Sequence, residues 1–339
     1  MGSCADGSPA RRARDEDGGG MVRAPGEEEY PLLVVAGATA SGKTALALRL
    51  AEELGGEIVS CDSVAVYRWM EIGTAKPTLE ERARVRHHCL DLYWPNEACT
   101  AGDYARHARA AVAEIRERGR IPIVTGGTGL YLRAFLEGLA PAPQRDDALR
   151  ERLRARAESK GSVWLHRVLQ RLDARAAELI HAHDVPKLVR SIEVTLAARW
   201  PQTEQWAAGR DPLRGYRVLQ MALAPERERL YARINLRAAA MFERGLVAET
   251  ERLRERFGED CRALGALGYA QAMAVLRGEM TMDAAVTAAQ QGHRNYAKRQ
   301  GTWFRREAGM RWLRGFGDEA AVLGEALEMA AAHVKGTAE

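Results

Sequence analysis

The chain has 339 residues, of which 46% are hydrophobic and 28% charged, and its formal net charge is +4. This length accommodates about two domains of roughly 150 residues, and the composition is that of a globular protein, which excludes a collagen, a coiled-coil rod and a mini-protein. No apolar stretch approaches the roughly 20 residues of a membrane-spanning helix, so no association with a membrane is expected.

The cysteines indicate a reducing compartment. Their number is odd and no two have the spacing CxxC: Cys4, Cys61, Cys89, Cys99 and Cys261. Neither a disulfide framework nor a zinc ribbon is therefore expected, and a cytoplasmic location is predicted. Residues 1–29 combine glycine and charged residues with almost no large apolar group, which predicts a disordered N-terminal tail.

Short strands and helices alternate after this tail. The apolar run 32–36 is typical of a strand buried on both faces of a parallel sheet. Alternation of this kind indicates βαβ units. The elements predicted for this part are strand 32–36, helix 43–54, a strand around 58–59, strand 88–92, helix 100–118 and strand 121–124.

The pattern becomes helical in the second half. Strand signals disappear over 144–211, where basic residues outnumber acidic ones. We predict a helical insertion there, between two parts of one catalytic core, 30–143 and 212–339. The remaining elements predicted are strand 217–223, helix 225–244, further helices to 304, strand 310–313 and helix 318–334.

A phosphate-binding pattern follows the first strand. The segment GATASGKT (37–44) matches G-x-x-x-x-G-K-[ST] between a predicted strand and a predicted helix. Its amides and the helix N-terminus attract phosphate oxygens, Lys43 adds a positive charge, and the Thr44 hydroxyl is placed to ligate Mg²⁺. The pattern predicts a site for a diphosphate or triphosphate without specifying the reaction.

The position of the acids argues against an ordinary ATPase. Strand 121–124 ends in Thr125 instead of the magnesium-binding acid of such enzymes, whereas Asp62 follows the second strand. Because the carboxyl ends of parallel strands share one crevice, Asp62 is expected beside the phosphate loop, as a proton acceptor or as the cap of a turn. Thr128 holds a substrate group there, or caps the helix that begins near Leu130.

These motifs, with several later ones, resemble the bacterial tRNA dimethylallyltransferases (tRNA isopentenyltransferases) of the IPP transferase family. The similar segments include GATASGKT (37–44), DSVAVYRWMEIGTAKP (62–77), GRIPIVTGGTGLYLRAFLEGL (119–139), LYARINLRAAAMFERGLVAE (230–249) and YAKRQGTWFRR (296–306). The resemblance covers about residues 31–315 and implies an α/β, P-loop kinase-like parallel sheet flanked by helices, with an all-helical tRNA-binding insertion.

The resemblance also implies a reaction. The enzyme would transfer the dimethylallyl group from dimethylallyl diphosphate to the exocyclic amine of adenosine 37, next to the anticodon, and release diphosphate. Mg²⁺ would be the cofactor and the anticodon loop of tRNA the partner, whereas no obligate protein partner is implied, and a monomer is expected.

Roles for individual residues are implied as well. Asp62 would be the general base, Thr128 would contact the tRNA base, and Lys43 and Arg233 would neutralise the diphosphate, with help from Arg237. The residues implied to bind diphosphate are Gly37, Thr39, Ala40, Ser41, Gly42, Lys43, Thr44 and Arg233. Those implied to bind tRNA are Asp62, Ser63, Val64, Ala65, Thr128, Arg150, Pro186, Lys187, Leu188, Val189 and Arg190.

This sequence departs from the family pattern at several of these positions. Ala65 stands where the family often has glutamine, and Pro186 and Lys187 replace glutamine and arginine. Lysine keeps the charge but loses the planar fork of arginine.

Three other functions are consistent with the motifs. A small-molecule P-loop kinase would turn over ATP, an adenylate isopentenyltransferase would modify free nucleotide, and an RNA-binding P-loop module would lack catalysis. The segment 291–315 contains seven basic residues and one acid, which favours a polyanionic partner such as RNA.

Overall fold

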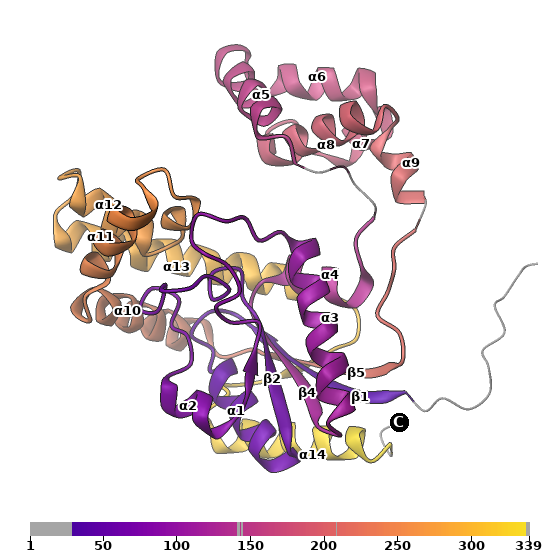
Figure 1. The fold of residues 1–339 in the computed structure, drawn as a ribbon, viewed down its shortest axis with the longest axis vertical. Coiled ribbons are helices and arrows are strands. Elements are labelled where there is room, and N and C mark those ends of the chain that lie inside the picture. Colours follow the sequence, from indigo (N-terminus) through magenta and orange to yellow (C-terminus); the bar gives the residue numbers. More distant parts are fainter. Residues whose placement is uncertain (1–28, 141–142, 144, 208, 337–339) are drawn as a thin grey trace, which may run out of the picture.

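The computed structural model describes residues 29–140, 143, 145–207 and 209–336. The predicted tail, 1–29, lies outside the described residues except for Glu29. A six-stranded sheet forms the centre of the molecule (Figure 1), with the order β3-β2-β4-β1-β5-β6 and every pairing parallel. This arrangement confirms the predicted fold class. The strands are β1 (Tyr30–Gly37), β2 (Gly56–Cys61), β3 (His87–His88), β4 (Ile121–Gly126), β5 (Tyr216–Leu223) and β6 (Met310–Leu313).

Helices cover both faces of this sheet. Along the central strand β1, Leu32 and Val34 pack against α3 and α4, while Leu33 and Val35 pack against α1 and α14. Successive side chains of a strand point to opposite faces, so the continuous apolar run reflects burial on both sides. The bounds are α1 (Lys43–Leu54), α2 (Leu79–Arg84), α3 (Ala101–Glu117), α4 (Gly129–Glu137) and α14 (Ala320–Val334).

The third strand is shorter than predicted. A strand was expected over 88–92, but β3 contains only His87–His88. Cys89 and Asp91 adopt φ angles of 60° and 55°, which lie outside the β region. The chain therefore turns away from the sheet, and the carboxylate of Asp91 reaches Lys76 instead.

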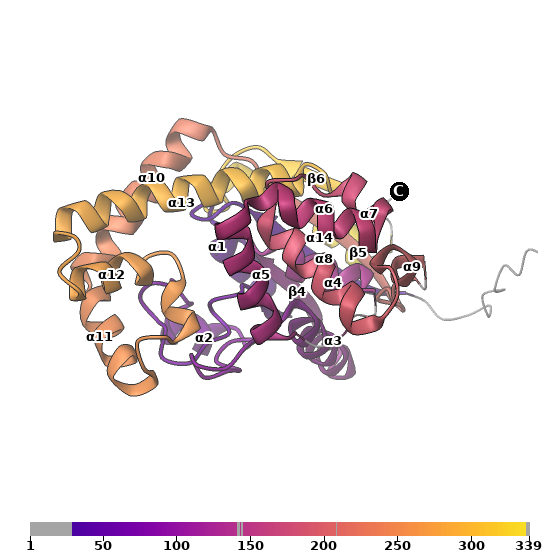
Figure 2. The same ribbon diagram turned by 90° about the horizontal axis from the view of Figure 1, so that it is seen from above.

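A second group of helices lies at the carboxyl ends of the strands (Figures 1 and 2), where α13 runs beside α10 and α11 lies against α12. These helices enclose their own apolar cluster, which includes Val66 and Met70 from the loop after β2. The loop is thereby fixed between the sheet and these helices. Their bounds are α10 (Arg227–Glu243), α11 (Leu246–Phe257), η1 (Arg262–Gly265), α12 (Tyr269–Leu276) and α13 (Met282–Phe304).

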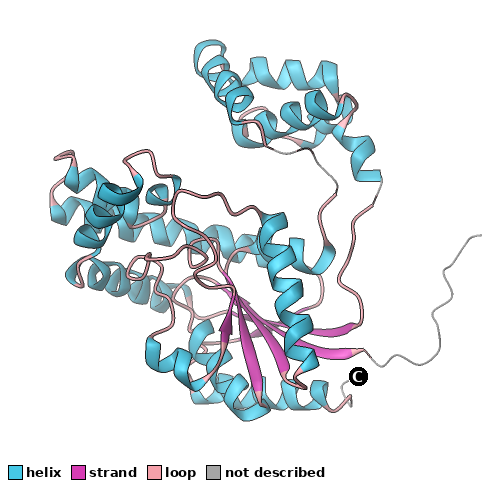
Figure 3. Ribbon diagram, in the orientation of Figure 1, coloured by secondary structure: helices cyan, strands magenta, loops and turns pink. Residues whose placement is uncertain are grey.

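The helices between residues 147 and 207 form a separate group, away from the sheet (Figures 1 and 3). Leu165, Leu188 and Ile192 are fully buried in a hydrophobic cluster of this group alone. The chain enters this group after α4 and leaves it before β5, and the predicted boundary at 143–144 falls in the entering segment, where 144 is outside the described residues. The bounds are α5 (Asp147–Lys160), α6 (Ser162–Leu172), α7 (Ala174–Leu179), α8 (Val185–Ala198) and α9 (Gln202–Ala207).

Within the described ranges, no helix has both the length and the apolar character needed to span a bilayer.

Candidate active site

A pocket of about 350 Å³ lies at the carboxyl ends of β1, β2 and β4. Gly126, the last residue of β4, is paired with Ala36 on one side and with Cys61 on the other. The residues that follow these three strands are therefore brought together at one edge of the sheet. Helices α10 and α13 close the opposite wall, to which they contribute Arg237, His293, Tyr296, Arg299 and Gln300.

The phosphate loop is held by close backbone packing. Gly42 has a φ of 91°, and a Cβ atom there would lie 2.7 Å from the Gly317 nitrogen, so the position requires glycine. The Ser41 carbonyl accepts a hydrogen bond of 3.0 Å from the same nitrogen. No side chain caps the N-terminus of α1, so its first amides remain available to an anion.

Lys43 is a cation in a desolvated position. Burial lowers its pKa to about 8, the charge of Arg237 acts in the same direction, and Asp62 opposes them. Its Nζ donates a hydrogen bond of 2.7 Å to the Ala38 carbonyl. A buried cation of this kind gains from a bound anion, which favours its charged form.

Arg237, and not Arg233, reaches the pocket. The Arg237 guanidinium donates to the Thr39 hydroxyl, and burial lowers its pKa. Arg233, one turn earlier on α10, forms an ion pair with Asp318, with 2.8 Å between Nη1 and Oδ1, and lies 4.1 Å above the Phe316 ring. The structure therefore does not bring Arg233 to the position that the resemblance implies for it.

Asp62 both caps a turn and faces the pocket. Its Oδ1 accepts hydrogen bonds from the amides of Val64 (2.8 Å) and Ala65 (3.1 Å). The side chain also lines the pocket that contains Lys43. Within the described part of the chain, Oδ2 has no hydrogen-bond donor, so it is the oxygen available to a ligand.

Thr128 does not use its hydroxyl to cap a helix. It is the N-cap residue of α4, but its side chain forms no capping hydrogen bond. The hydroxyl instead accepts the Ser63 N–H at 3.1 Å and donates to the Ser63 hydroxyl at 3.4 Å. Thr128 thus holds the turn that begins at Asp62, while Ser63, Val64 and Ala65 line the pocket.

Three pocket residues from α13 were not identified from the sequence. Gln300 contacts the phosphate loop at Thr39 and the loop after β4 at Gly127. Burial lowers the pKa of His293 to about 4, which leaves its imidazole neutral near pH 7. Burial also raises the pKa of Tyr296 to about 12. Their spacing, 293, 296 and 300, places them on one face of a helix, a signal that could have identified them.

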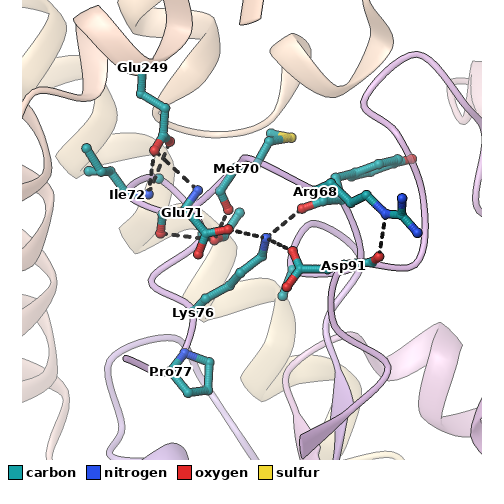
Figure 4. A network of polar contacts seen from close by, with 12 residues as sticks. Arg68, Met70, Glu71, Ile72, Lys76, Pro77, Asp91 and Glu249 are labelled. Atoms are coloured by element: carbon teal, nitrogen blue, oxygen red, sulfur yellow. Dashed lines mark hydrogen bonds and ion pairs between the residues drawn. The ribbon is translucent and has the colours of Figure 1, made fainter. Parts of the chain in front are cut away.

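A network of charges fixes the loop between Asp62 and Pro77 (Figure 4). The Lys76 side chain is only 1% exposed, and its Nζ lies 2.6 Å from Asp91 and 3.0 Å from Glu71. It also donates to the Tyr67 carbonyl at 2.6 Å. This wall of the pocket is therefore held in place by paired charges, although it contains no regular secondary structure.

The residues of the insertion implied to bind tRNA have different environments. Arg150 and Arg190 both pair with Glu193, which is fully buried, at 2.8 and 2.7 Å. Leu188 and Val189 are buried in the cluster of the insertion. Both side chains pack inward in this structure, and the contact of these two residues with tRNA stays a prediction.

Pro186 and Lys187 are exposed in the first turn of α8, where Lys187 pairs with Asp184 at 2.5 Å. Neither lies in the pocket.

Comparisons with known proteins agree with one another. A family described as IPP transferase matches residues 65–307. A tRNA dimethylallyltransferase of Koribacter versatilis is 58% identical over 298 residues, which cover 88% of this chain and 97% of that protein. A tRNA dimethylallyltransferase of Solibacter usitatus is 51% identical over 302 residues, or 89% of this chain and 98% of the relative.

Solved structures are similar as well. The tRNA isopentenylpyrophosphate transferase of Bacillus halodurans has a TM-score of 0.67 and 34% identity, and the match covers 91% of this chain and 98% of that one. A eukaryotic dimethylallyltransferase acting on tRNA has a TM-score of 0.77 at 23% identity, over 91% of this chain and 80% of that one. This last likeness concerns the fold.

Proposed function

The chain belongs to the IPP transferase family of tRNA dimethylallyltransferases, and we propose that its reaction takes place in the pocket between the phosphate loop and Asp62. The enzyme transfers the dimethylallyl group from dimethylallyl diphosphate to the exocyclic amine of adenosine 37 of tRNA and releases diphosphate. The observation that supports this site is the presence of Lys43 and Asp62 in one pocket, because the reaction requires a diphosphate-binding group and a proton acceptor on either side of the reacting carbon.

At one end of the pocket, the phosphate loop binds the diphosphate. The amides at the start of α1, the Lys43 ammonium and the Arg237 guanidinium oppose the negative charge that develops on the leaving group. Because these groups are already oriented, they stabilise the transition state without reorganisation.

Mg²⁺ is proposed to bind with the diphosphate, and Thr44 is its protein ligand. Thr44 and Asp62 offer oxygen atoms in the pocket, the donors that Mg²⁺ prefers. Among the described residues no group of three or more His, Cys, Asp or Glu side chains could hold a metal ion, and substrate phosphates and water would supply most of the ligands of this one. When bound, the ion offsets part of the leaving-group charge.

At the other end, the pocket receives an extruded adenine. Removing a base from its stack costs a few kcal/mol, and single-stranded loops are where proteins read RNA bases. As the bond between the amine nitrogen and the allylic carbon forms and the carbon–oxygen bond breaks, Oδ2 of Asp62 accepts the amine proton.

Replacing Arg237 by methionine is expected to lower kcat/KM for dimethylallyl diphosphate by about 10²–10³-fold, the effect of removing one donor to a developing anion. Arg233→Met is the matched control on the same helix. Since it removes an exposed ion pair, its effect is expected to stay below about fivefold. Steady-state kinetics with saturating tRNA measure both, and equal losses would contradict the assignment.

Arg190→Ala is expected to weaken tRNA binding and to reduce the slope of log K against log salt by about 0.7, the value for one lost phosphate contact with a single strand. The variant leaves the pair between Arg150 and Glu193 in place, so the insertion remains packed. Filter binding over a salt series measures the slope, with Arg49→Ala, on α1, as the control. An unchanged slope would remove Arg190 from the tRNA interface.

One experiment separates the possible functions. The enzyme is incubated with Mg²⁺, dimethylallyl diphosphate and either tRNA or AMP, and in parallel with ATP and candidate acceptors. The expected result is a mass gain of one dimethylallyl group on tRNA alone. A gain on AMP would indicate an adenylate isopentenyltransferase, and ATP turnover with phosphorylation of an acceptor would indicate a kinase.

A further inference from the structure

We propose that Gln300 is a positioning residue that sets the separation between the diphosphate end and the acceptor end of the pocket. The inference rests on the proposed location of the reaction and adds a role that neither the phosphate loop nor Asp62 supplies. Gln300 lies in the last turns of α13, far in the sequence from both loops that it contacts.

The Gln300 carboxamide binds both loops at once. Its Oε1 accepts the Thr39 N–H at 2.8 Å, and its Nε2 donates to the Gly127 carbonyl at 2.9 Å. The residue is only 5% exposed. Because a buried amide keeps its hydrogen bonds at nearly fixed geometry, this side chain fixes the distance between the phosphate loop and the loop after β4.

The local packing leaves room for this arrangement. A Cβ atom at Gly127 would lie 2.1 Å from the Gln300 Nε2, so only glycine allows the carboxamide to approach. Because the Thr39 N–H already donates a hydrogen bond to Gln300 Oε1, it is not available to a phosphate oxygen. Loss of Gln300 therefore removes the side chain that aligns the two loops.

The connection continues to the proton acceptor. Thr128 follows Gly127 directly, and its hydroxyl accepts the Ser63 N–H at 3.1 Å. Ser63 follows Asp62, whose own Oδ1 caps the same turn. A short series of hydrogen bonds thus joins the phosphate loop to the turn that carries the general base, with Gln300 as its first link.

The test uses the full-length enzyme with tRNA, Mg²⁺ and dimethylallyl diphosphate. Gln300→Met removes both hydrogen bonds at similar length, and Gln300→Glu keeps the acceptor for Thr39 while removing the donor to Gly127. Gln290→Met is the matched control, because Gln290 lies on the same helix and donates to the Asn235 carbonyl at 3.2 Å, outside the pocket. The melting temperature of each variant is measured alongside kcat and KM.

Gln300→Met is expected to lower kcat by about 10²-fold, the cost of a misplacement near 1 Å, with little change in the KM for dimethylallyl diphosphate. Gln300→Glu is expected to lower kcat as well and to raise this KM, because its carboxylate adds a negative charge to the pocket that binds the diphosphate. The combination of Gln300→Met with Thr128→Val is expected to be no slower than the slower single variant, since both break one series of contacts.

Three results would overturn the proposal. These are a kcat equal to that of Gln290→Met, a rise in KM at unchanged kcat, and multiplicative losses in the double variant. Absence of transfer to tRNA by the unaltered enzyme would instead refute the proposed function itself, so the two failures are distinguishable.

Discussion

Replacing Asp62 by asparagine is expected to lower the rate of dimethylallyl transfer by about 10²–10⁴-fold, the range for loss of a general base. Asparagine keeps an oxygen that can accept the hydrogen bonds from Val64 and Ala65, so the turn retains its cap. The substitution therefore removes the proton acceptor and leaves the loop in place. Single-turnover kinetics with bound tRNA measure the chemical step directly.

Asp62→Ala supplies the comparison, because it removes the acceptor and the cap together. The tRNA affinity of Asp62→Ala is expected to fall, whereas Asp62→Asn should bind tRNA as the unaltered enzyme does. An Asp62→Asn variant with full turnover would show that the amine loses its proton to another group.

Lys43→Met is expected to reduce kcat/KM for dimethylallyl diphosphate by about 10²–10³-fold, since it removes a preorganised positive charge that stabilises the leaving group.

The unaltered enzyme should also show a pH dependence of kcat/KM for dimethylallyl diphosphate. The pKa of Lys43 is lowered to about 8, so the ammonium is present below that pH and is lost as the pH rises through it. We therefore expect kcat/KM to fall by about tenfold per pH unit above 8, since this parameter reports groups of the free enzyme.

In Lys43→Met this decline should be absent, because no group of that pKa remains at the site. The measurement is kcat/KM for dimethylallyl diphosphate between pH 6.5 and 9.5, at constant ionic strength. The slope of log kcat/KM against pH above 8 is compared between the unaltered enzyme and Lys43→Met. A decline of the same slope in both would assign it to a group other than Lys43.

The local features of the site were readable from the sequence. Apolar runs predicted β1 and β4, because a strand buried on both faces needs no polar alternation. The segment 37–44 was recognisable because a phosphate loop depends on glycine and lysine at set intervals. Asp62 was expected beside it, since parallel strands end at a common edge. Each of these predictions depends on residues that are close together in the sequence, or on the rule that parallel strands of one sheet end at a common edge.

The sequence did not show which of Arg233 and Arg237 reaches the phosphate loop. The two lie one turn apart on α10, so the same face of a helix carries both. Which of them reaches the phosphate loop depends on how far α10 is displaced along its axis relative to β1. Packing against α13 and the ion pair of Arg233 with Asp318 decide this, and they are long-range contacts.

Periodicity and turn chemistry act over a few residues, so the parallel sheet, the phosphate loop and the acid beside it could be predicted from local patterns, whereas the length of β3 could not. Only the tertiary structure brought Gln300 of α13 against Thr39, more than 250 positions earlier in the chain. It also decided that Thr128 holds Ser63 instead of capping α4. Such contacts depend on how separate helices and loops pack together, and no local pattern encodes that packing.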